Sequence, residues 1–112
     1  MNKIEKHKAL CDELHDTYER KNHDYGDSFG KSFEKYGITA AMVRMEDKWN
    51  RLENLSSKKV FPLISNESIK DTLLDLANYA LMTYMELQLI DDADVQKYTP
   101  NIEVGYIHGY AD

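Results

Sequence analysis

The sequence is poor in cysteine, proline and glycine. It contains one cysteine, Cys11, two prolines and five glycines among 112 residues. A single cysteine cannot form an intramolecular disulfide, and such sparing use of cysteine is typical of a reducing compartment. The scarcity of glycine and proline excludes collagen-like and low-complexity chains, because both depend on these residues. We therefore expect one ordered domain with one hydrophobic core.

Positive charge and long hydrophobic runs are also scarce. Lys and Arg total 14 against 20 Asp and Glu, so the formal net charge is -6. Proteins that bind DNA or RNA normally carry a surplus of Lys and Arg, so we expect no nucleic-acid polymer as a partner. The most apolar run, residues 72–85, is too short and too polar to span a bilayer, and the N-terminus lacks the apolar core of a signal peptide. We expect a cytoplasmic protein without a membrane partner.

Apolar residues recur at steps of three and four in three long segments, which predicts three long helices. These segments are residues 2–20, 38–55 and about 67–90. A loop is expected at KNHDYGDSFG, because Asn, Asp and Gly accumulate there, and a short helical piece should follow it and end at Gly37. The sequence therefore predicts an all-α bundle of three long helices and a short one.

The apolar pattern also indicates how the bundle is organised. In the second long helix a seam of apolar residues is expected to lie in the core; it consists of Ile38, Ala41, Met42, Met45, Trp49 and Leu52. The third helix is the least polar of the three, so it should lie at the centre of the helical bundle that residues 1–90 form. Residues 91–112 should form a tail that packs on the bundle or on a partner subunit. Three antiparallel helices enclose little space, so we expect a homo-oligomer, at least a dimer.

One residue of the third helix is out of place. In DTLLDLANYALMTYM, residues 71–85, the only charge after Asp71 is Asp75, although apolar residues occupy nearly every face. Glu67, Asp71 and Asp75 follow one another at steps of four and Asn78 comes three later, so they form a column on one side of the helix. An ionised carboxylate in an apolar setting is very unfavourable unless a positive group compensates it.

Two compensating groups fit this pattern, and both remain open. Arg44, Lys48 and Arg51 form a basic edge on the second helix, which would meet the carboxylates if the second and third helices are antiparallel. Alternatively, the column holds Mg²⁺ or Mn²⁺, because carboxylates supply the hard oxygen ligands that these cations prefer. A cation would also let a phosphorylated ligand approach an acidic pocket.

Three blocks of the sequence resemble a known family. KNHDYGDSF, VRMEDKWNRLENL and ESIKDTLLDLANYALM, in this order, are similar to the nucleotide modification associated domain family of phages and bacteria, and the likeness covers residues 13–85. The Glu67 to Asp71 pair also resembles the metal-binding helix of the MazG-like all-α nucleoside triphosphate pyrophosphatases. This second resemblance implies an oligomeric bundle that binds Mg²⁺ and a nucleotide and releases pyrophosphate.

The pyrophosphatase resemblance implies roles for individual residues. Glu67 and Asp71 match its second acidic motif, as catalytic and metal-binding residues, and Asp75 follows one turn later. Its first motif, E-x-x-E, is not matched: the chain has EDKWNRLE there, with Asp47 as the candidate metal ligand. With a metal in place, the basic edge of Arg44, Lys48 and Arg51 would stabilise charge on the leaving pyrophosphate.

The segment around Tyr25 has the composition of a nucleotide contact. Lys21 suits a phosphate, Asn22 and Asp24 suit base or sugar edges, and the ring of Tyr25 suits stacking, with Asn78 as a further amide. The same segment also fits a turn that ends a helix with Tyr25 packed beneath it.

The leading interpretation is a Mg²⁺-dependent nucleoside triphosphate pyrophosphatase-like protein that acts on a small-molecule nucleotide. Two alternatives stay open. One is a non-catalytic nucleotide-binding or sequestering module of phage type, and the other is a structural homo-oligomer in which the acidic column is a salt-bridge network.

Overall fold

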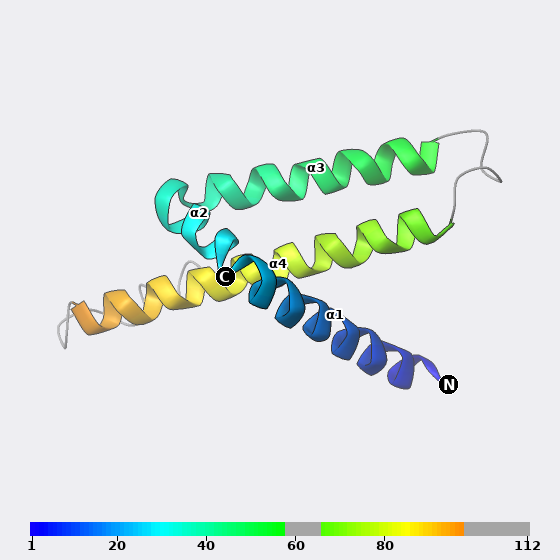
Figure 1. The fold of residues 1–112 in the computed structure, drawn as a ribbon, viewed down its shortest axis with the longest axis horizontal. Coiled ribbons are helices and arrows are strands. Elements are labelled where there is room, and N and C mark those ends of the chain that lie inside the picture. Colours follow the sequence, from blue (N-terminus) through cyan, green and yellow to red (C-terminus); the bar gives the residue numbers. More distant parts are fainter. Residues whose placement is uncertain (58–65, 98–112) are drawn as a thin grey trace.

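A computed structural model of the protein describes residues 1–57 and 66–97, which form four helices. These are α1 (Lys3–Tyr25), α2 (Ser28–Tyr36), α3 (Ile38–Ser57) and α4 (Asn66–Lys97), shown in Figure 1. The described ranges contain no strand, so the predicted all-α class is confirmed. The predicted packing of the tail beyond Lys97 lies outside the described residues.

Helix α1 is longer than the sequence predicted. It begins with a capping box, in which the Asn2 side chain accepts from the backbone N–H of Glu5 and the Glu5 carboxylate accepts from the backbone N–H of Asn2. It ends at Gly26, whose φ of 66° lies in the left-handed region that favours glycine. The expected loop over residues 21–30 is therefore reduced to Gly26 and Asp27. Polar residues lower helix propensity only slightly, so the helix continues until a glycine ends it.

The short helix α2 ends at Gly37 as the sequence predicted, but it begins at Ser28, within the expected loop. Asp27 is its N-cap and accepts from the backbone N–H of Gly30 at 3.1 Å. A side chain at position 30 would displace the Asp27 carboxylate from this capping position. The helix ends at Gly37, whose N–H donates to the carbonyl of Phe33. Together these caps fix the orientation in which Phe33 is buried.

Helices α3 and α4 run antiparallel and form the largest contact of the fold (Figure 1). Helix α3 ends two residues after its predicted end, and α4 continues seven residues beyond its predicted end at Ile90. Helix α4 contacts each of the other three helices, as expected for the centre of the bundle. Helix α1 crosses α4 obliquely instead of lying antiparallel to it (Figure 1), so the predicted arrangement of three antiparallel helices is wrong.

The hydrophobic core of the single chain is small. Phe33 and Ala41 are the buried hydrophobic residues of the described ranges, and two threonines, Thr72 and Thr83, are buried with them. Helix α1 has no buried residue. The bundle is therefore held together largely by the contact between α3 and α4.

No helix in the described ranges has the length and hydropathy needed to cross a membrane.

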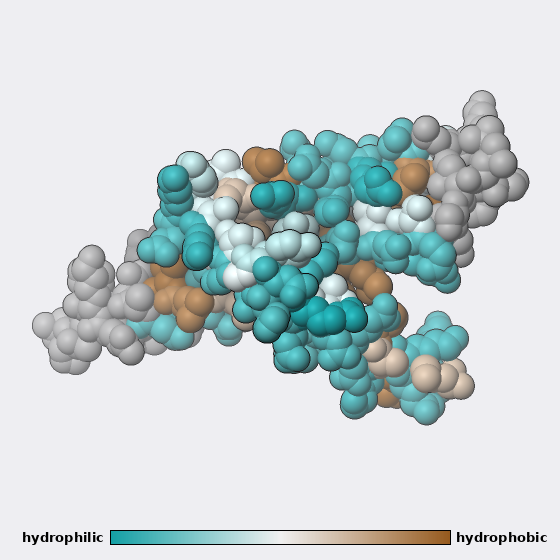
Figure 2. Space-filling view, viewed as in Figure 1, coloured by the Kyte–Doolittle hydropathy of each residue, from teal (hydrophilic) through white to brown (hydrophobic). Residues whose placement is uncertain are grey.

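Part of the predicted core is exposed. Ile38, Met42 and Trp49 were expected in the core, yet they are 49%, 57% and 53% exposed. Their neighbours Ala41 and Met45 lie further round the helix, where they are buried or half-buried. The seam is wider than the surface that α4 covers, so only one edge of it is packed within a single chain. Hydrophobic surface also covers the C-terminal part of α4 at the left of Figure 2.

We expect the substitution Phe33→Ala to lower the free energy of unfolding by about 3 kcal/mol, because it removes a buried ring and leaves a cavity. The ring of Phe33 lies 6.2 Å from that of Phe29, which in turn lies 5.8 Å from Tyr79 of α4. Urea denaturation followed by circular dichroism measures the loss. The control is Tyr36→Ala on the same helix, which is 64% exposed and should cost about 0.5 kcal/mol or less. Equal losses would contradict the packing of α2 described here.

Candidate functional site

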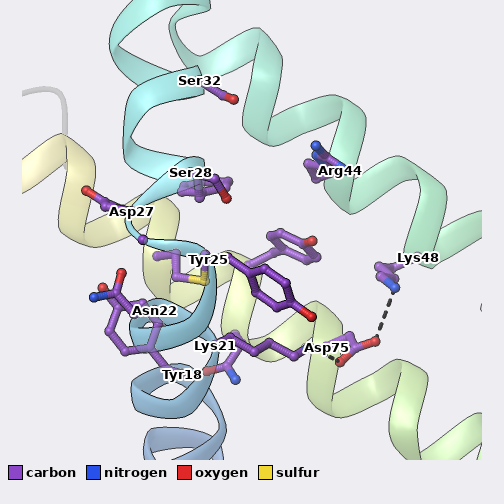
Figure 3. A pocket seen from close by; sticks show the side chains of 15 residues that line it. Tyr18, Lys21, Asn22, Tyr25, Asp27, Ser28, Ser32, Arg44, Lys48 and Asp75 are labelled. Carbon is purple, nitrogen blue, oxygen red and sulfur yellow. Dashed lines mark ion pairs between the residues drawn. The ribbon is translucent and has the colours of Figure 1, made fainter.

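All four helices, with the connection between α1 and α2, contribute to one pocket of about 410 Å³ (Figure 3). Its wall combines three cations, two carboxylates, four aromatic rings and several small polar groups. The lining residues are Tyr18, Lys21, Asn22, Tyr25, Gly26, Asp27, Ser28, Phe29, Ser32, Arg44, Lys48, Asp75, Asn78, Tyr79 and Met82. We refer to this cavity as the pocket.

Asp75 lies between two lysines from two different helices. Its Oδ2 is 3.1 Å from Nζ of Lys48 on α3, and its Oδ1 is 4.0 Å from Nζ of Lys21 on α1, as the dashed lines in Figure 3 mark. The Asp75 side chain is 36% exposed. Two ammonium groups thus compensate the carboxylate on an otherwise apolar helix. The ion pair between the second and third long helices, which was one of the two predicted alternatives, is therefore present.

Arg44 is the third cation of the pocket. It lies four residues before Lys48, so both side chains project from the same side of α3. No ion pair joins Arg44 to another residue of the described ranges. Its guanidinium group therefore lines the pocket with its donors available to an anionic ligand.

Arg51 continues the basic edge of α3 but does not reach the pocket. Its Nε donates to the hydroxyl of Thr72 at 3.2 Å, and that hydroxyl donates to the carbonyl of Ser68 at 2.7 Å. Thr72 is buried. This chain of hydrogen bonds fixes α3 against the first turns of α4, so Arg51 has a structural partner, although the sequence predicted it as a substrate contact.

Aromatic rings from three helices line the pocket together with the cations. Tyr18 and Tyr25 come from α1, Phe29 from α2 and Tyr79 from α4. The rings of Phe29 and Tyr79 are tilted against each other at 46°. The amide nitrogen of Asn78 donates to the carbonyl of Leu14 at 3.2 Å, which connects α4 to α1. These contacts position the aromatic wall relative to Asp75.

The pocket brings together most of the predicted ligand-contacting residues. Lys21, Asn22 and Tyr25 line it from the last turns of α1 instead of from a loop, and Arg44, Lys48 and Asn78 line it from α3 and α4. Asp24 is exposed and lies 3.3 Å from the ring of His23. Like Arg51, it does not line the pocket. Because consecutive helical residues differ in direction by about 100°, Asp24 projects away from Tyr25.

The predicted acidic residues do not gather in the described structure. Asp75 lines the pocket, whereas Glu67, Asp71 and Asp47 are exposed and lie outside it. Four residues exceed one helical turn, so a column at this spacing winds gradually around α4. Within residues 1–57 and 66–97 there is no group of three or more His, Cys, Asp or Glu residues suited to a metal ion. The assignment of these residues to a metal stays a prediction.

Several pocket residues were not predicted. Tyr18 and Tyr79 fall at helical spacing among apolar residues, a pattern typical of packing. Their hydroxyl groups are the feature that distinguishes them from purely apolar core residues. Asp27, Ser28 and Phe29 belong to the KNHDYGDSF block, and only the path of the chain through α2 shows that they face the same space.

One comparison with known proteins finds a relationship. The family model described as nucleotide modification associated domain 1 matches residues 21–87. The matched segment runs from the end of α1 into α4, and it contains every lining residue of the pocket except Tyr18. No curated protein and no solved structure matches the chain.

A second acidic group lies between α2 and α4. Burial raises the pKa of the Glu86 carboxyl, and the negative charges of Asp27 and Glu34 raise it further. A carboxyl whose pKa is raised by folding stabilises the fold while it is protonated, and this contribution is lost as the pH rises through the folded-state pKa. The ionised form of Glu86 therefore destabilises the packing of α2 on α4 relative to the protonated form.

We expect Glu86→Gln to raise the free energy of unfolding at about pH 7, where the wild-type carboxyl is ionised, by no more than about 0.5 kcal/mol. The advantage should shrink as the pH falls and disappear near pH 3, below the ordinary pKa of a glutamate, where the wild-type carboxyl is protonated in both states. Thermal unfolding of both proteins across this range measures the effect. The matched control is Glu53→Gln on α3, which is exposed and for which no difference is expected. A variant less stable than wild type at neutral pH would contradict the proposed repulsion.

Proposed function

This chain belongs to the nucleotide modification associated domain 1 family, and we propose that its pocket binds a small-molecule nucleotide. The observation that carries the proposal is the clustering of Lys21, Arg44 and Lys48 with the rings of Tyr18 and Tyr25 in one cavity. A nucleotide has an anionic part and an aromatic part, and this pocket has a complementary region for each.

The charge of the pocket differs in sign from that of the chain. Three cations face two carboxylates, Asp27 and Asp75, while the whole sequence has a formal net charge of -6. Like-charged side chains repel one another, so a cluster of cations in an acidic protein is favourable when an anion joins it. The volume of about 410 Å³ lies within the usual range for small-molecule sites, about 300–1,000 Å³. Phosphate groups of a nucleotide supply the anion.

The aromatic side of the pocket suits a base. Every nucleobase has a flat face that stacks on an aromatic ring, and such stacking contributes about 1–3 kcal/mol per base. Tyr18 and Tyr25 lie on α1, and Asn22 lies between them on the same wall. Its amide offers both a donor and an acceptor to a base or sugar edge, as the hydroxyls of Ser28 and Ser32 do from α2.

The catalytic form of the proposal adds Mg²⁺ or Mn²⁺ and MazG-like release of pyrophosphate. The donor set of the described residues does not fit a cation held by the protein alone, because Asp75 is the only predicted metal ligand in the pocket and it is paired with Lys48. Magnesium in nucleotide sites is commonly held by one or two carboxylates together with phosphate oxygens. The described residues therefore support nucleotide binding better than they support metal-dependent release of pyrophosphate.

We also propose that the protein is a homo-oligomer in which a second copy covers the face of α3 and α4 opposite the pocket. Ile38, Met42 and Trp49 fall on one side of α3, because they are separated by four and seven residues. On α4, Tyr84 comes nine residues after Asp75, which places the two side chains on opposite sides of the helix, and Tyr84 is 65% exposed. The pocket and this apolar face therefore lie on opposite sides of the pair of helices.

The extent of this face supports a second copy as its occupant. Besides Ile38, Met42, Trp49 and Tyr84 it includes Leu73, and all five are about half exposed or more. Half-exposed residues of this size leave on the order of 100 Å² each, so the face offers roughly 500 Å² per copy before its polar rim is counted, and a standard interface buries about 800 Å² per partner. Two such faces buried against each other would complete the core that one chain leaves open.

We expect a deoxynucleoside monophosphate or triphosphate to bind in calorimetry, and Arg44→Ala to weaken binding about tenfold or more, since a hydrogen bond to a charged group contributes about 1.5–3 kcal/mol. Arg44 has no ion pair in the described structure, so its loss removes little else. The control is Lys31→Ala, an exposed cation of α2 outside the pocket. The unphosphorylated nucleoside should bind much more weakly.

The same samples separate binding from catalysis. Pyrophosphate released from a triphosphate with Mg²⁺, and lost in Asp71→Ala, would support the MazG-like activity. Binding without release would support a non-catalytic nucleotide-binding module. Equal affinity of wild type for nucleoside and nucleotide would contradict the assignment of the three cations to phosphate.

We expect the wild-type protein to elute with the mass of a dimer or a larger assembly in size-exclusion chromatography with light scattering, and Trp49→Glu to reduce that mass, because it places a charge in the proposed interface. The matched control is Val43→Glu, which is 53% exposed and projects from α3 at about 120° from Trp49, so it should leave the mass unchanged. A monomeric wild-type protein would refute the assembly.

A further inference from the structure

We infer that Asp75 is an internal counter-ion of the pocket, one that occupies the lysine pair a phosphate group needs and that a ligand of higher negative charge displaces. The inference rests on the proposed function, because it assigns the selectivity of the same pocket. It makes Asp75 a residue that determines which phosphorylated ligands bind, instead of one that holds a metal.

The geometry of Asp75 supports this role. Each of its two oxygens faces a different lysine, with Lys48 Nζ at 3.1 Å from Oδ2 and Lys21 Nζ at 4.0 Å from Oδ1. The two lysines come from α3 and α1, so the carboxylate bridges two walls of the pocket. In Figure 3 the three side chains converge at one end of it. A phosphate that bridges both ammonium groups therefore competes with the carboxylate for them.

The competition depends on charge. The Asp75 carboxylate carries one negative charge, whereas a phosphate monoester carries about 1.5–2 negative charges at neutral pH and presents three strong acceptor oxygens. A monoester therefore attracts the lysine pair more strongly than the carboxylate does. A phosphodiester has one negative charge and gains little over Asp75. The pocket should consequently prefer nucleotides with a terminal phosphate monoester to cyclic or diester nucleotides.

Arg44 makes the displacement favourable. It lines the same pocket without an ion pair in the described ranges, so it can join the incoming phosphate while Lys48 exchanges its partner. The exchange leaves Asp75 partly exposed to water, as it already is at 36% exposure, so the displaced carboxylate is not stranded in an apolar interior. An ion pair between exposed groups contributes little stability, which keeps the cost of breaking it low.

The test is the substitution Asp75→Asn, measured by calorimetry with a deoxynucleoside 5′-monophosphate in the presence of EDTA. We expect the variant to bind about tenfold more tightly than wild type, because both lysines are freed for the phosphate. For the corresponding 3′,5′-cyclic monophosphate the gain should be larger still, since the single charge of that ligand no longer competes with the carboxylate. The preference for monoester over diester should therefore narrow.

Two controls isolate the effect. Asp16→Asn makes the same chemical change at an exposed position of α1 outside the pocket, and it should alter affinity less than about twofold, which bounds the effect of net charge alone. Asp75→Ser removes the same charge and leaves a smaller side chain. If Asp75→Asn does not fold, Asp75→Ser takes its place, and it should show the same gain in affinity for the monophosphate.

The outcomes distinguish this inference from the proposed function. If wild type binds the monophosphate and Asp75→Asn binds it equally or more weakly, the counter-ion role is overturned and nucleotide binding stands. If Asp75→Asn loses affinity only when Mg²⁺ replaces EDTA and gains none without it, Asp75 is a metal ligand and the inference is wrong. If neither protein binds a phosphorylated ligand, the proposed function itself fails.

Discussion

The packing of α3 against α4 is the contact on which the arrangement of this protein depends, and Asp75 pairs with Lys48 across it. A carboxylate on the central helix α4 reaches a lysine of α3 and a lysine of α1, so three of the four helices meet at one charge. Apolar side chains of α4, among them Leu74, Leu76 and Met82, are half-buried and add to the small buried core of α2 and α3, whereas a partly exposed ion pair contributes little stability. The same charge that joins the helices also defines the polar end of the pocket.

The pair of α3 and α4 has two faces of opposite character. Toward α1 and α2 it presents Arg44, Lys48 and Asp75, and on the other side it presents Trp49, Met42 and Tyr84. One helix can serve both faces because residues separated by half a turn project in opposite directions. Ligand recognition and the proposed self-association are thus built on one scaffold without sharing side chains, and substitutions on either face can be examined separately.

The existence and type of each helix could be predicted from the sequence, because apolar periodicity and the positions of Gly37 and the N-terminal caps are local signals. The end of α1 could not, since polar residues at positions 21–24 look like a loop although only Gly26 ends the helix. Asp75 stood out as a charge that needs a partner. Which of Arg44, Lys48 and Arg51 would provide it depends on the register between α3 and α4, and this register is a tertiary property. Lys21 was predicted to contact phosphate, and nothing in the spacing linked it to Asp75.

Helix α1 supplies Tyr18, Lys21, Asn22 and Tyr25 to the pocket, yet none of its residues is buried. One wall of the cavity is therefore attached to the rest by a few polar contacts, among them the hydrogen bond from Asn78 to the carbonyl of Leu14. The observed affinity equals the intrinsic affinity multiplied by the fraction of molecules in which that wall is docked. A ligand that touches both α1 and α3 acts as a crosslink between them, and part of what it gains in contacts goes into shifting this docking equilibrium.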